Sequence, residues 1–316
     1  MESAALPLLF EPIFQERVWG GRGLESAFGK ELPAGKKIGE SWEIVDRPES
    51  QSIVRQGPWR GRTLHELWCE KHDEIFGAEV VATPRFPILA KLLDAQATLS
   101  LQVHPPAKIA ASLGGEPKTE MWYIAAAEPG AELFVGLRRG TTRARFEEAL
   151  ASDEVAGLLH RLPVRADDVV FVPSGRLHAI GGGNLIVEIQ QNSDTTYRVF
   201  DWDRASSGAP PRSLHIAEAM QSIDFDDFEP GLVRPEGESL LRTPEFAVAR
   251  WVLTAPRRAL EEPAAAIFYC LNGAVETAGV EITAGEFFLV PATADAATLR
   301  PLAPATSLLR VALPTR

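Results

Sequence analysis

The sequence predicts a mostly β protein with a few short helices. Its 24 prolines and 25 glycines divide the 316 residues into short segments. Several of these segments are rich in β-branched and aromatic residues, such as 169–172 and 287–290, and this composition is typical of strands bounded by turns. Helical periodicity is confined to a few places, so we expect strands to build the cores.

A weak internal repeat predicts two copies of one small β-barrel of the jelly-roll type. Residues 167–173 and 285–291 share a pattern of a turn, an acid, four apolar residues and a proline. Upstream of each, residues 120–123 match residues 266–269, except that Glu120 is replaced by alanine in the second copy. We therefore expect one barrel to carry chemistry and the other to be structural.

An acidic run followed by Pro230 and Gly231 places the expected domain boundary near residue 230. We expect an N-terminal domain over residues 1–230 and a C-terminal domain over 231–316, with the acidic run at 224–229 as the linker. Thr63 and Glu66 form a plausible capping box at the start of a helix. Apolar spacing predicts a helical excursion around residues 143–161, and a third helix is expected after Ser213.

Charge and composition limit the partners. The formal net charge of −11 disfavours nucleic acid and anionic membranes, which bind basic surfaces. A small anion would need a local cluster of lysine and arginine. The two cysteines, Cys69 and Cys270, have no metal or redox spacing. The N-terminal residues resemble neither a signal peptide nor a membrane span, so we expect a cytoplasmic protein. We also expect it to be a monomer or a weak homodimer.

The stretch from Thr98 to Pro106 predicts a strand with one polar face. Polar residues at positions 98, 100, 102 and 104 alternate with Leu99, Leu101 and Val103. Successive side chains of a strand point to opposite faces, so Gln102 and His104 should project together. Such a face could simply meet water, but Gln and His side by side are also suited to a metal site in a barrel cavity.

A second histidine lies in a recognisable turn. Residues 173–178 read Pro-Ser-Gly-Arg-Leu-His, an arrangement that resembles the second motif of the cupin superfamily, in which a turn delivers a histidine to a metal. Further segments, in order along residues 8–215, resemble the type I mannose-6-phosphate isomerases in their short bacterial form. These segments are Trp19–Gly21, Ile38–Trp42, Leu92–Ala95, Leu101–Pro105, Lys118–Tyr123, His178–Ile180 and Glu188–Arg198.

The resemblance implies one zinc ion per chain, held in the N-terminal barrel. By similarity, His104, Glu120 and His178 would be its ligands, with Gln102 as a fourth. Imidazole nitrogen and carboxylate oxygen suit zinc. The donor set by itself would equally accept iron, manganese or nickel.

The resemblance also implies interconversion of mannose 6-phosphate and fructose 6-phosphate through a cis-enediol, with the zinc polarising the carbonyl. Arg198 aligns with the arginine of that family's active site and would stabilise the enediolate. Glu188 and Lys118 are equal candidates for the base. The candidates for binding the phosphate are Lys91, Lys118, Arg176, Arg198 and Arg204.

Two other functions are compatible with parts of the pattern. A cupin dioxygenase would need a redox metal such as iron, and the intact order of the motifs disfavours it. A non-catalytic sensor of sugar phosphates would keep the barrel and lose a ligand or Arg198, and none of these is lost. The sequence therefore favours the isomerase.

Overall fold

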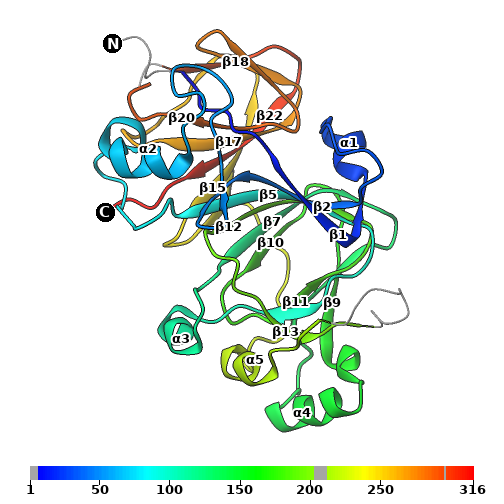
Figure 1. The fold of residues 1–316 in the computed structure, drawn as a ribbon. Helices are drawn as coiled ribbons and strands as arrows, with labels where there is room; N and C mark the ends of the chain where they lie inside the picture. The colour runs from blue at the N-terminus through cyan, green and yellow to red at the C-terminus, as the bar shows by residue number, and fades with distance from the viewer. Residues whose placement is uncertain (1–5, 203–211, 295–296) are drawn as a thin grey trace.

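Four antiparallel sheets stacked in series organise the computed structural model, which describes residues 6–202, 212–294 and 297–316 (Figure 1). We call the sheets outer N-terminal, inner N-terminal, inner C-terminal and outer C-terminal, in the order in which they stack. The two N-terminal sheets form one sandwich and the two C-terminal sheets form another.

The two N-terminal sheets draw their strands from distant parts of the sequence. In spatial order, the inner N-terminal sheet consists of β1 (Ile13–Gly21), β2 (Ile38–Ile44), β5 (Ile88–Ala95), β12 (Asn184–Gln191), β7 (Glu120–Ala127) and β10 (Val169–Val172). The outer N-terminal sheet consists, again in spatial order, of β13 (Tyr197–Phe200), β6 (Leu101–Val103), β11 (His178–Ile180), β8 (Glu132–Leu137) and β9 (Leu159–Pro163).

The C-terminal half has the same plan. Its inner sheet consists of β14 (Ser239–Arg242), β15 (Ala247–Leu253), β22 (Thr306–Ala312), β17 (Ala266–Asn272) and β20 (Phe287–Val290). Its outer sheet consists of β16 (Arg257–Arg258), β21 (Thr298–Pro301), β18 (Ala274–Thr277) and β19 (Val280–Thr283). A two-stranded ribbon, β3 (Asp46–Arg47) with β4 (Ser50–Gln51), lies apart from these sheets.

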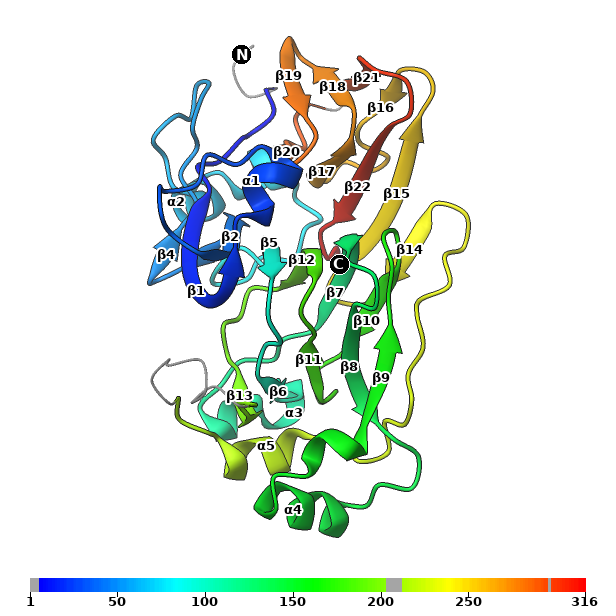
Figure 2. The same ribbon diagram turned by 90° about the vertical axis from the view of Figure 1, so that its right-hand side faces the viewer.

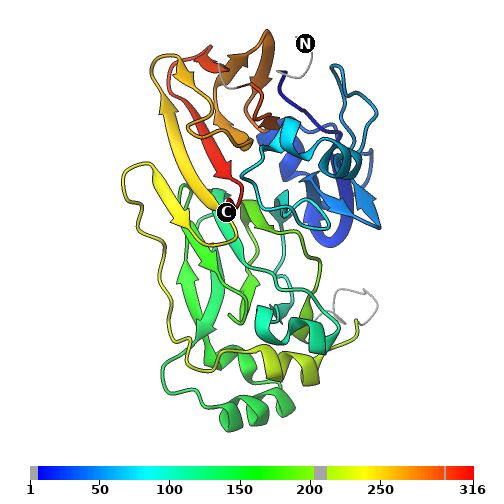
Figure 3. The same cartoon turned by 90° about the vertical axis from the view of Figure 1, so that its left-hand side faces the viewer.

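Short helices cover the far side of the N-terminal sandwich. The helices α4 (Arg143–Ala151) and α5 (Ile216–Ser222) contribute Phe146 and Met220 to an apolar cluster on the outer N-terminal sheet. Together with α3 (Ala107–Ala110), they gather at the end of the molecule away from the C-terminal half (Figures 2 and 3). The helix α1 (Gly23–Phe28) follows β1, and α2 (Leu64–Glu70) runs into a π-helical turn at His72–Phe76.

The internal repeat predicted from sequence reappears as one shared register. In β7 and β10 Glu120 pairs with Val172, and in β17 and β20 the equivalent Ala266 pairs with Val290. The order β5-β12-β7-β10 likewise matches β15-β22-β17-β20. The predicted class, mostly β with a few short helices, is confirmed. Among the strands of the described residues, the sheets face one another as open sandwiches and do not close into hydrogen-bonded barrels.

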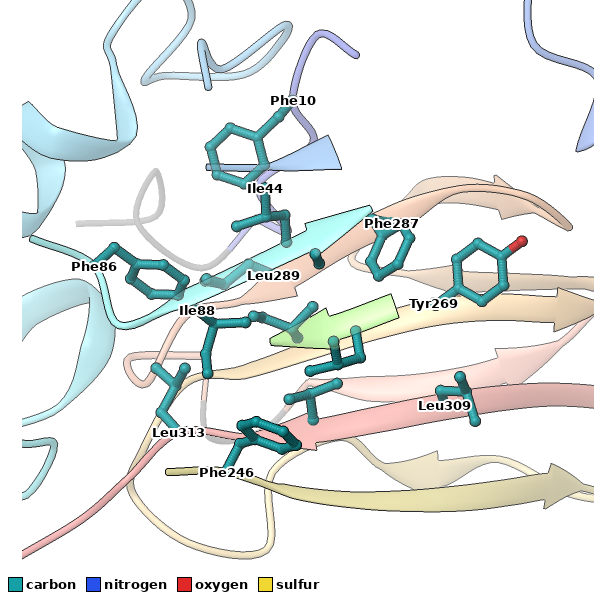
Figure 4. Close-up of a cluster of buried hydrophobic side chains, with 14 of the residues drawn as sticks. Phe10, Ile44, Phe86, Ile88, Phe246, Tyr269, Phe287, Leu289, Leu309 and Leu313 are labelled. Atoms are coloured by element: carbon teal, nitrogen blue, oxygen red, sulfur yellow. The ribbon is translucent and has the colours of Figure 1, made fainter. Parts of the chain in front are cut away.

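The two halves share one core. Alternate residues of the inner N-terminal sheet, including Ile88 and Ile189, belong to the same buried cluster as Leu289 and Leu309 of the inner C-terminal sheet. Figure 4 shows Ile88 beside Leu289, with Leu309 farther along the same cluster. The other face of the inner N-terminal sheet, with Trp122 and Ile186, packs on the outer N-terminal sheet. The inner N-terminal sheet is therefore buried on both faces.

Of the three helices predicted from the sequence, two are observed as expected and one is shorter. The capping box is confirmed, because the Thr63 hydroxyl accepts from the Glu66 amide and the Glu66 carboxylate accepts from the Thr63 amide. The excursion at 143–161 is helical only to Ala151, since Asp153 has a φ of 60° and turns the chain away; a 3-10 turn and β9 follow. The helix expected after Ser213 is α5.

Two segments differ from expectation for clear physical reasons. The polar-faced strand spans only Leu101–Val103, and it does not continue beyond His104 because Pro105 and Pro106 cannot donate to a ladder. The acidic run at 224–229, expected to be a linker, packs against the N-terminal sandwich. The Asp227 carboxylate accepts two hydrogen bonds from Arg176, and Phe228 packs against the outer N-terminal sheet. Among the residues described, no helix is both long and apolar enough to cross a membrane.

The shared core predicts that both halves lose stability when it is damaged. Leu309→Ala removes a side chain that is 0% exposed and should lower the free energy of unfolding by about 3 kcal/mol. Leu302→Ala, at a position 51% exposed, should change it by less than about 0.5 kcal/mol. Urea unfolding followed by tryptophan fluorescence measures both. Two separate transitions, of which only one moves in Leu309→Ala, would contradict the shared core.

Candidate metal centre and cavity

Three ligand-type side chains meet between the two N-terminal sheets. One ligand atom from each of His104, Glu120 and His178 lies within 4.8 Å of the others. All three residues are buried, with exposed fractions of 0%, 1% and 0%. In the described part of the chain, this is the one group of histidine, cysteine or acidic residues with metal-binding geometry.

The strand registers explain why these side chains converge. Gln102 on β6 is paired with His178 on β11 and, on its other side, with Arg198 on β13. These three residues form one row across the outer N-terminal sheet. Glu120 comes from β7 of the facing sheet, and His104 follows β6 directly. The cluster therefore spans the gap of the sandwich.

A glycine turn joins the two histidine segments. Gly175 has a φ of 96°, a conformation that residues with a Cβ rarely adopt. Its amide donates to the carbonyl of His104 at 2.8 Å. The Pro-Ser-Gly-Arg-Leu-His segment thus fixes His104 while it delivers His178 to the same place.

Backbone carbonyls set the tautomer of both histidines. His104 Nδ1 lies 2.7 Å from the carbonyl oxygen of Thr195, and His178 Nδ1 lies 2.9 Å from that of Arg176. A carbonyl oxygen can only accept, so each Nδ1 carries the proton. Each Nε2 is then left with a lone pair directed into the cluster, the arrangement that metal-binding histidines use.

The electrostatics of the cluster call for a cation. Burial and the Lys118 ammonium lower the pKa of His104, and burial with the neighbouring His104 lowers the pKa of His178 to about 3. His104 Nε2 lies 3.0 Å from Glu120 Oε1 without a hydrogen bond between them, while Lys118 Nζ contacts the same carboxylate oxygen at 2.5 Å. Two buried acceptors thus face each other with no proton between them. Such a pair is satisfied by a metal ion bound to both.

Gln102 is placed to add a fourth donor. Its amide nitrogen lies 3.2 Å from His178 Nε2. Rotation of the amide by 180° puts the oxygen at that position instead, because the two ends of an amide have nearly the same shape. The residues present therefore fit a four-ligand site made of two nitrogens and two oxygens.

A polar cavity of about 500 Å³ adjoins the cluster. The basic side chains that line it are Arg17, Lys91, Lys118, Arg198 and Arg212. The acidic side chains that line it are Glu16, Glu40, Glu120, Glu188 and Asp194. A cavity with this volume accommodates a small polar molecule, and its charged walls favour one that carries charge itself.

Glu188 occupies an unusual position in this cavity. It is 2% exposed, and its Oε1 lies 3.3 Å from Lys91 Nζ and 3.7 Å from Lys118 Nζ. Burial and the negative charge of Glu120 raise the pKa of Glu188 to about 7. Although burial opposes ionisation of Glu120 as well, Lys118 and His104 hold its pKa well below the ordinary value. The two carboxyl groups therefore differ in basicity, as acid-base pairs in active sites do.

Of the other cations predicted for the site, some line the cavity and one does not. Lys118 Nζ lies 2.5 Å from Glu120 Oε1. Arg198 lines the cavity, where its Nε donates to the Ser100 hydroxyl at 3.3 Å. Arg176, a further candidate for the phosphate-binding cations, does not line the cavity, because its guanidinium is bound to Asp227. Arg204 lies outside the described residues.

Several charged residues line the cavity beyond those predicted from the sequence, and Arg17 and Glu40 are two of them. Glu40 on β2 forms an ion pair with Arg17 on β1, with 2.8 Å between Oε1 and Nε. Gly20 and Gly39 let these strands approach, since a Cβ on Gly20 would lie only 2.4 Å from the Gly39 nitrogen. Glu40 belongs to the Ile38–Trp42 segment, which carries part of the family resemblance, and that was a usable signal. Nothing in the sequence marked Arg17.

The fold and this site define a cupin-type metal centre in a double sandwich. Residues 8–137 match the family model described as phosphomannose isomerase type I, catalytic domain. The chain is 40% identical over 257 residues to mannose-6-phosphate isomerase ManA of Bacillus subtilis, covering 78% of this chain and 80% of ManA. It is 37% identical over 259 residues to mannose-6-phosphate isomerase of Streptococcus mutans, covering 79% and 80%.

Solved structures of mannose 6-phosphate isomerases have the same fold as this chain. The crystal structure of mannose 6-phosphate isomerase from B. subtilis is 32% identical and superposes with a TM-score of 0.86, covering 97% of this chain and 99% of that one. A structure from Archaeoglobus fulgidus, at 21% identity and a TM-score of 0.82, shares the fold. The chain therefore belongs to the type I phosphomannose isomerase family, and the family predicted from its motifs is confirmed.

The cluster predicts a specific loss of metal binding. His178→Ala should abolish stoichiometric zinc binding, since it removes one nitrogen donor and leaves the acceptors of His104 and Glu120 without a full ligand set. His160→Ala, on β9 of the same sheet but outside the cluster, should still bind one zinc per chain. Metal content after dialysis measures both. Full zinc content in His178→Ala would show that the cluster is not the site.

Proposed function

We propose that this chain interconverts mannose 6-phosphate and fructose 6-phosphate, with one zinc ion held by Gln102, His104, Glu120 and His178. Family membership supports the substrate pair. A zinc- and yttrium-bound mannose 6-phosphate isomerase, at 17% identity and a TM-score of 0.72, shares the fold. The observation that carries the proposal is the raised basicity of Glu188 in the same cavity as the metal cluster.

The reaction moves a proton between C1 and C2 of an open-chain sugar phosphate. When bound, zinc supplies a Lewis acid that polarises the carbonyl. A base must take the carbon-bound proton, and a cation must stabilise the enediolate. The remaining steps fall to the side chains around the cavity.

Glu188 is our choice for the base, ahead of Lys118. A carboxylate whose pKa is raised to about 7 is a strong acceptor that is still ionised in part near neutral pH. Lys118 Nζ lies close to both Glu120 and Glu188, at 2.5 Å and 3.7 Å from their Oε1 atoms. From this position the Lys118 ammonium can stabilise the charge of both carboxylates and can return a proton to the sugar oxygen. Lys118 thus serves as the acid.

Arg198 faces the base from the opposite sheet. It is paired with Gln102 in the strand register, so its guanidinium lies on the same wall as the metal cluster. Its backbone amide also donates to His215 Nδ1 at 3.2 Å, which anchors the strand next to α5. A permanent cation with a fixed fork of donors stabilises the negative charge that develops on the enediolate oxygens.

Chelation and zinc restoration test the function directly. Purified protein should form fructose 6-phosphate from mannose 6-phosphate, lose this activity after treatment with a chelator, and regain it with added zinc. A coupled assay for fructose 6-phosphate measures the rate. Absence of turnover in protein that carries one zinc per chain would contradict the proposal, and binding of the sugar phosphate without turnover would then indicate a sensor.

Arg198→Ala should separate catalysis from metal binding. The variant should retain one zinc per chain, because Arg198 is not a ligand, and its kcat should fall by about 100-fold with loss of the charge on the enediolate. Arg145→Ala, an exposed position on α4, is the matched control and should keep the kcat of the wild type. A near-normal kcat in zinc-loaded Arg198→Ala would disprove the catalytic role.

A further inference from the structure

A buried row of alternating charges leads from the mouth of the cavity to Glu188. Glu40 Oε1 lies 2.8 Å from Arg17 Nε, and Glu40 Oε2 accepts a bond from the Trp42 indole at 2.7 Å. Lys91 Nζ lies 3.7 Å from Glu40 Oε2 on one side and 3.3 Å from Glu188 Oε1 on the other. Glu40 and Lys91 are 8% and 6% exposed. None of the proposed catalytic steps employs Glu40.

The sheet register makes this row a fixed arrangement. Lys91 on β5 is paired with Glu188 on β12 and with Trp42 on β2. Lys91 therefore stands between two strands that each present a carboxylate to it. Burial alone would lower the pKa of Lys91, but Glu188 and Glu40 together raise it above its ordinary value, so the ammonium stays charged. One cation is shared between two anions.

We propose that Glu40 is a positioning residue for the isomerisation: it holds Lys91 between two carboxylates, so that Glu188 is not fully paired and remains able to accept a proton. The inference rests on the proposed function, in which Glu188 is the base. Without Glu40, the Lys91 ammonium would pair with Glu188 alone. A fully paired carboxylate is a weaker base.

The charges that face Glu188 determine whether its pKa rises or falls when the Glu40 charge is removed. These are Lys91 from β5, Lys118 from the segment before β7, Glu120 from β7 and Glu40 from β2. Loss of the Glu40 charge removes one anion from this set and leaves both lysines. The carboxylate form of Glu188 is then favoured, so the base ionises at lower pH and is weaker when ionised. A bound metal changes the charge near Glu120 equally in wild type and variant.

The same strand offers a matched control. Glu43 is also buried, at 5% exposure, and its Oε1 lies 2.7 Å from Lys30 Nζ and accepts a bond from the Ser41 hydroxyl at 2.6 Å. It differs from Glu40 in lying outside the cavity lining. Both substitutions to glutamine remove one buried, paired carboxylate from β2. A merely structural role would give the two variants the same behaviour.

The test is the pH dependence of kcat/KM for mannose 6-phosphate with the zinc-loaded enzyme. In the wild type, activity should fall as the pH drops through the titration of Glu188. In Glu40→Gln this acidic limb should move about one pH unit to lower pH, with kcat on the plateau about threefold lower. In Glu43→Gln the limb should stay where it is in the wild type. Zinc content and circular dichroism establish that each variant is folded and loaded.

A double-mutant cycle completes the test. If Glu40 acts mainly through Lys91, Glu40→Gln should shift the limb in the wild-type background and should shift it much less in the Lys91→Met background, where only the direct effect of the Glu40 charge on Glu188 is left. If Glu40→Gln alone fails to fold, Glu40→Asp takes its place in the cycle: it keeps the charge but withdraws the carboxylate from Lys91, and it should move the limb in the same direction by a smaller amount.

The possible failures are distinguishable. A wild-type enzyme without turnover overturns the proposed function and this inference with it. A working wild type in which Glu40→Gln leaves the limb unmoved, or in which Glu43→Gln moves it equally, overturns the inference alone. The same holds if Glu40→Gln shifts the limb as much in the Lys91→Met background as in the wild type.

Discussion

The inner N-terminal sheet is buried on both faces, and this double burial governs how the two halves and the cavity are built. A strand alternates its side chains between two faces, so each of β5, β7 and β12 must satisfy two environments at once. Residues such as Tyr123 and Ile189 pack into the core shared with the C-terminal half. Their neighbours Trp122 and Glu188 line the cavity of the N-terminal sandwich. The same hydrogen-bonded strands therefore support stability on one side and chemistry on the other.

Charged groups can occupy the cavity face only because they are arranged in alternation. An isolated buried carboxylate costs several kcal/mol, whereas carboxylates and cations placed in turn satisfy one another. The row from Arg17 through Glu40 and Lys91 to Glu188 follows this rule. At the metal cluster the alternation is incomplete: Lys118 contacts the Glu120 carboxylate, but the Nε2 acceptor of His104 faces the same carboxylate with no proton between them. This local imbalance gives a metal ion its binding site.

The C-terminal half shows what the same topology becomes without that chemistry. Its equivalent of Trp122 is Phe268, which stacks on Phe288 with 5.2 Å between ring centroids, and its equivalent of Glu120 is Ala266. Apolar side chains fill the space between its sheets, and in the described part of the chain no ligand cluster is found there. The C-terminal copy of the repeat is thus a sandwich filled with apolar side chains. It packs against the inner N-terminal sheet through the shared core and so stabilises that sheet.

The β class, the repeat, the family and the residue types of the metal cluster can all be predicted from the sequence, because strand alternation and the glycine turn before His178 are local properties of the chain. Which cations share the cavity becomes visible once the chain is folded. Arg176 faces Asp227 instead, while Arg17, which nothing in its own strand marks, reaches the cavity through its ion pair with Glu40 on the neighbouring strand. Convergence depends on register between strands far apart in sequence, and side-chain spacing along one segment does not encode it.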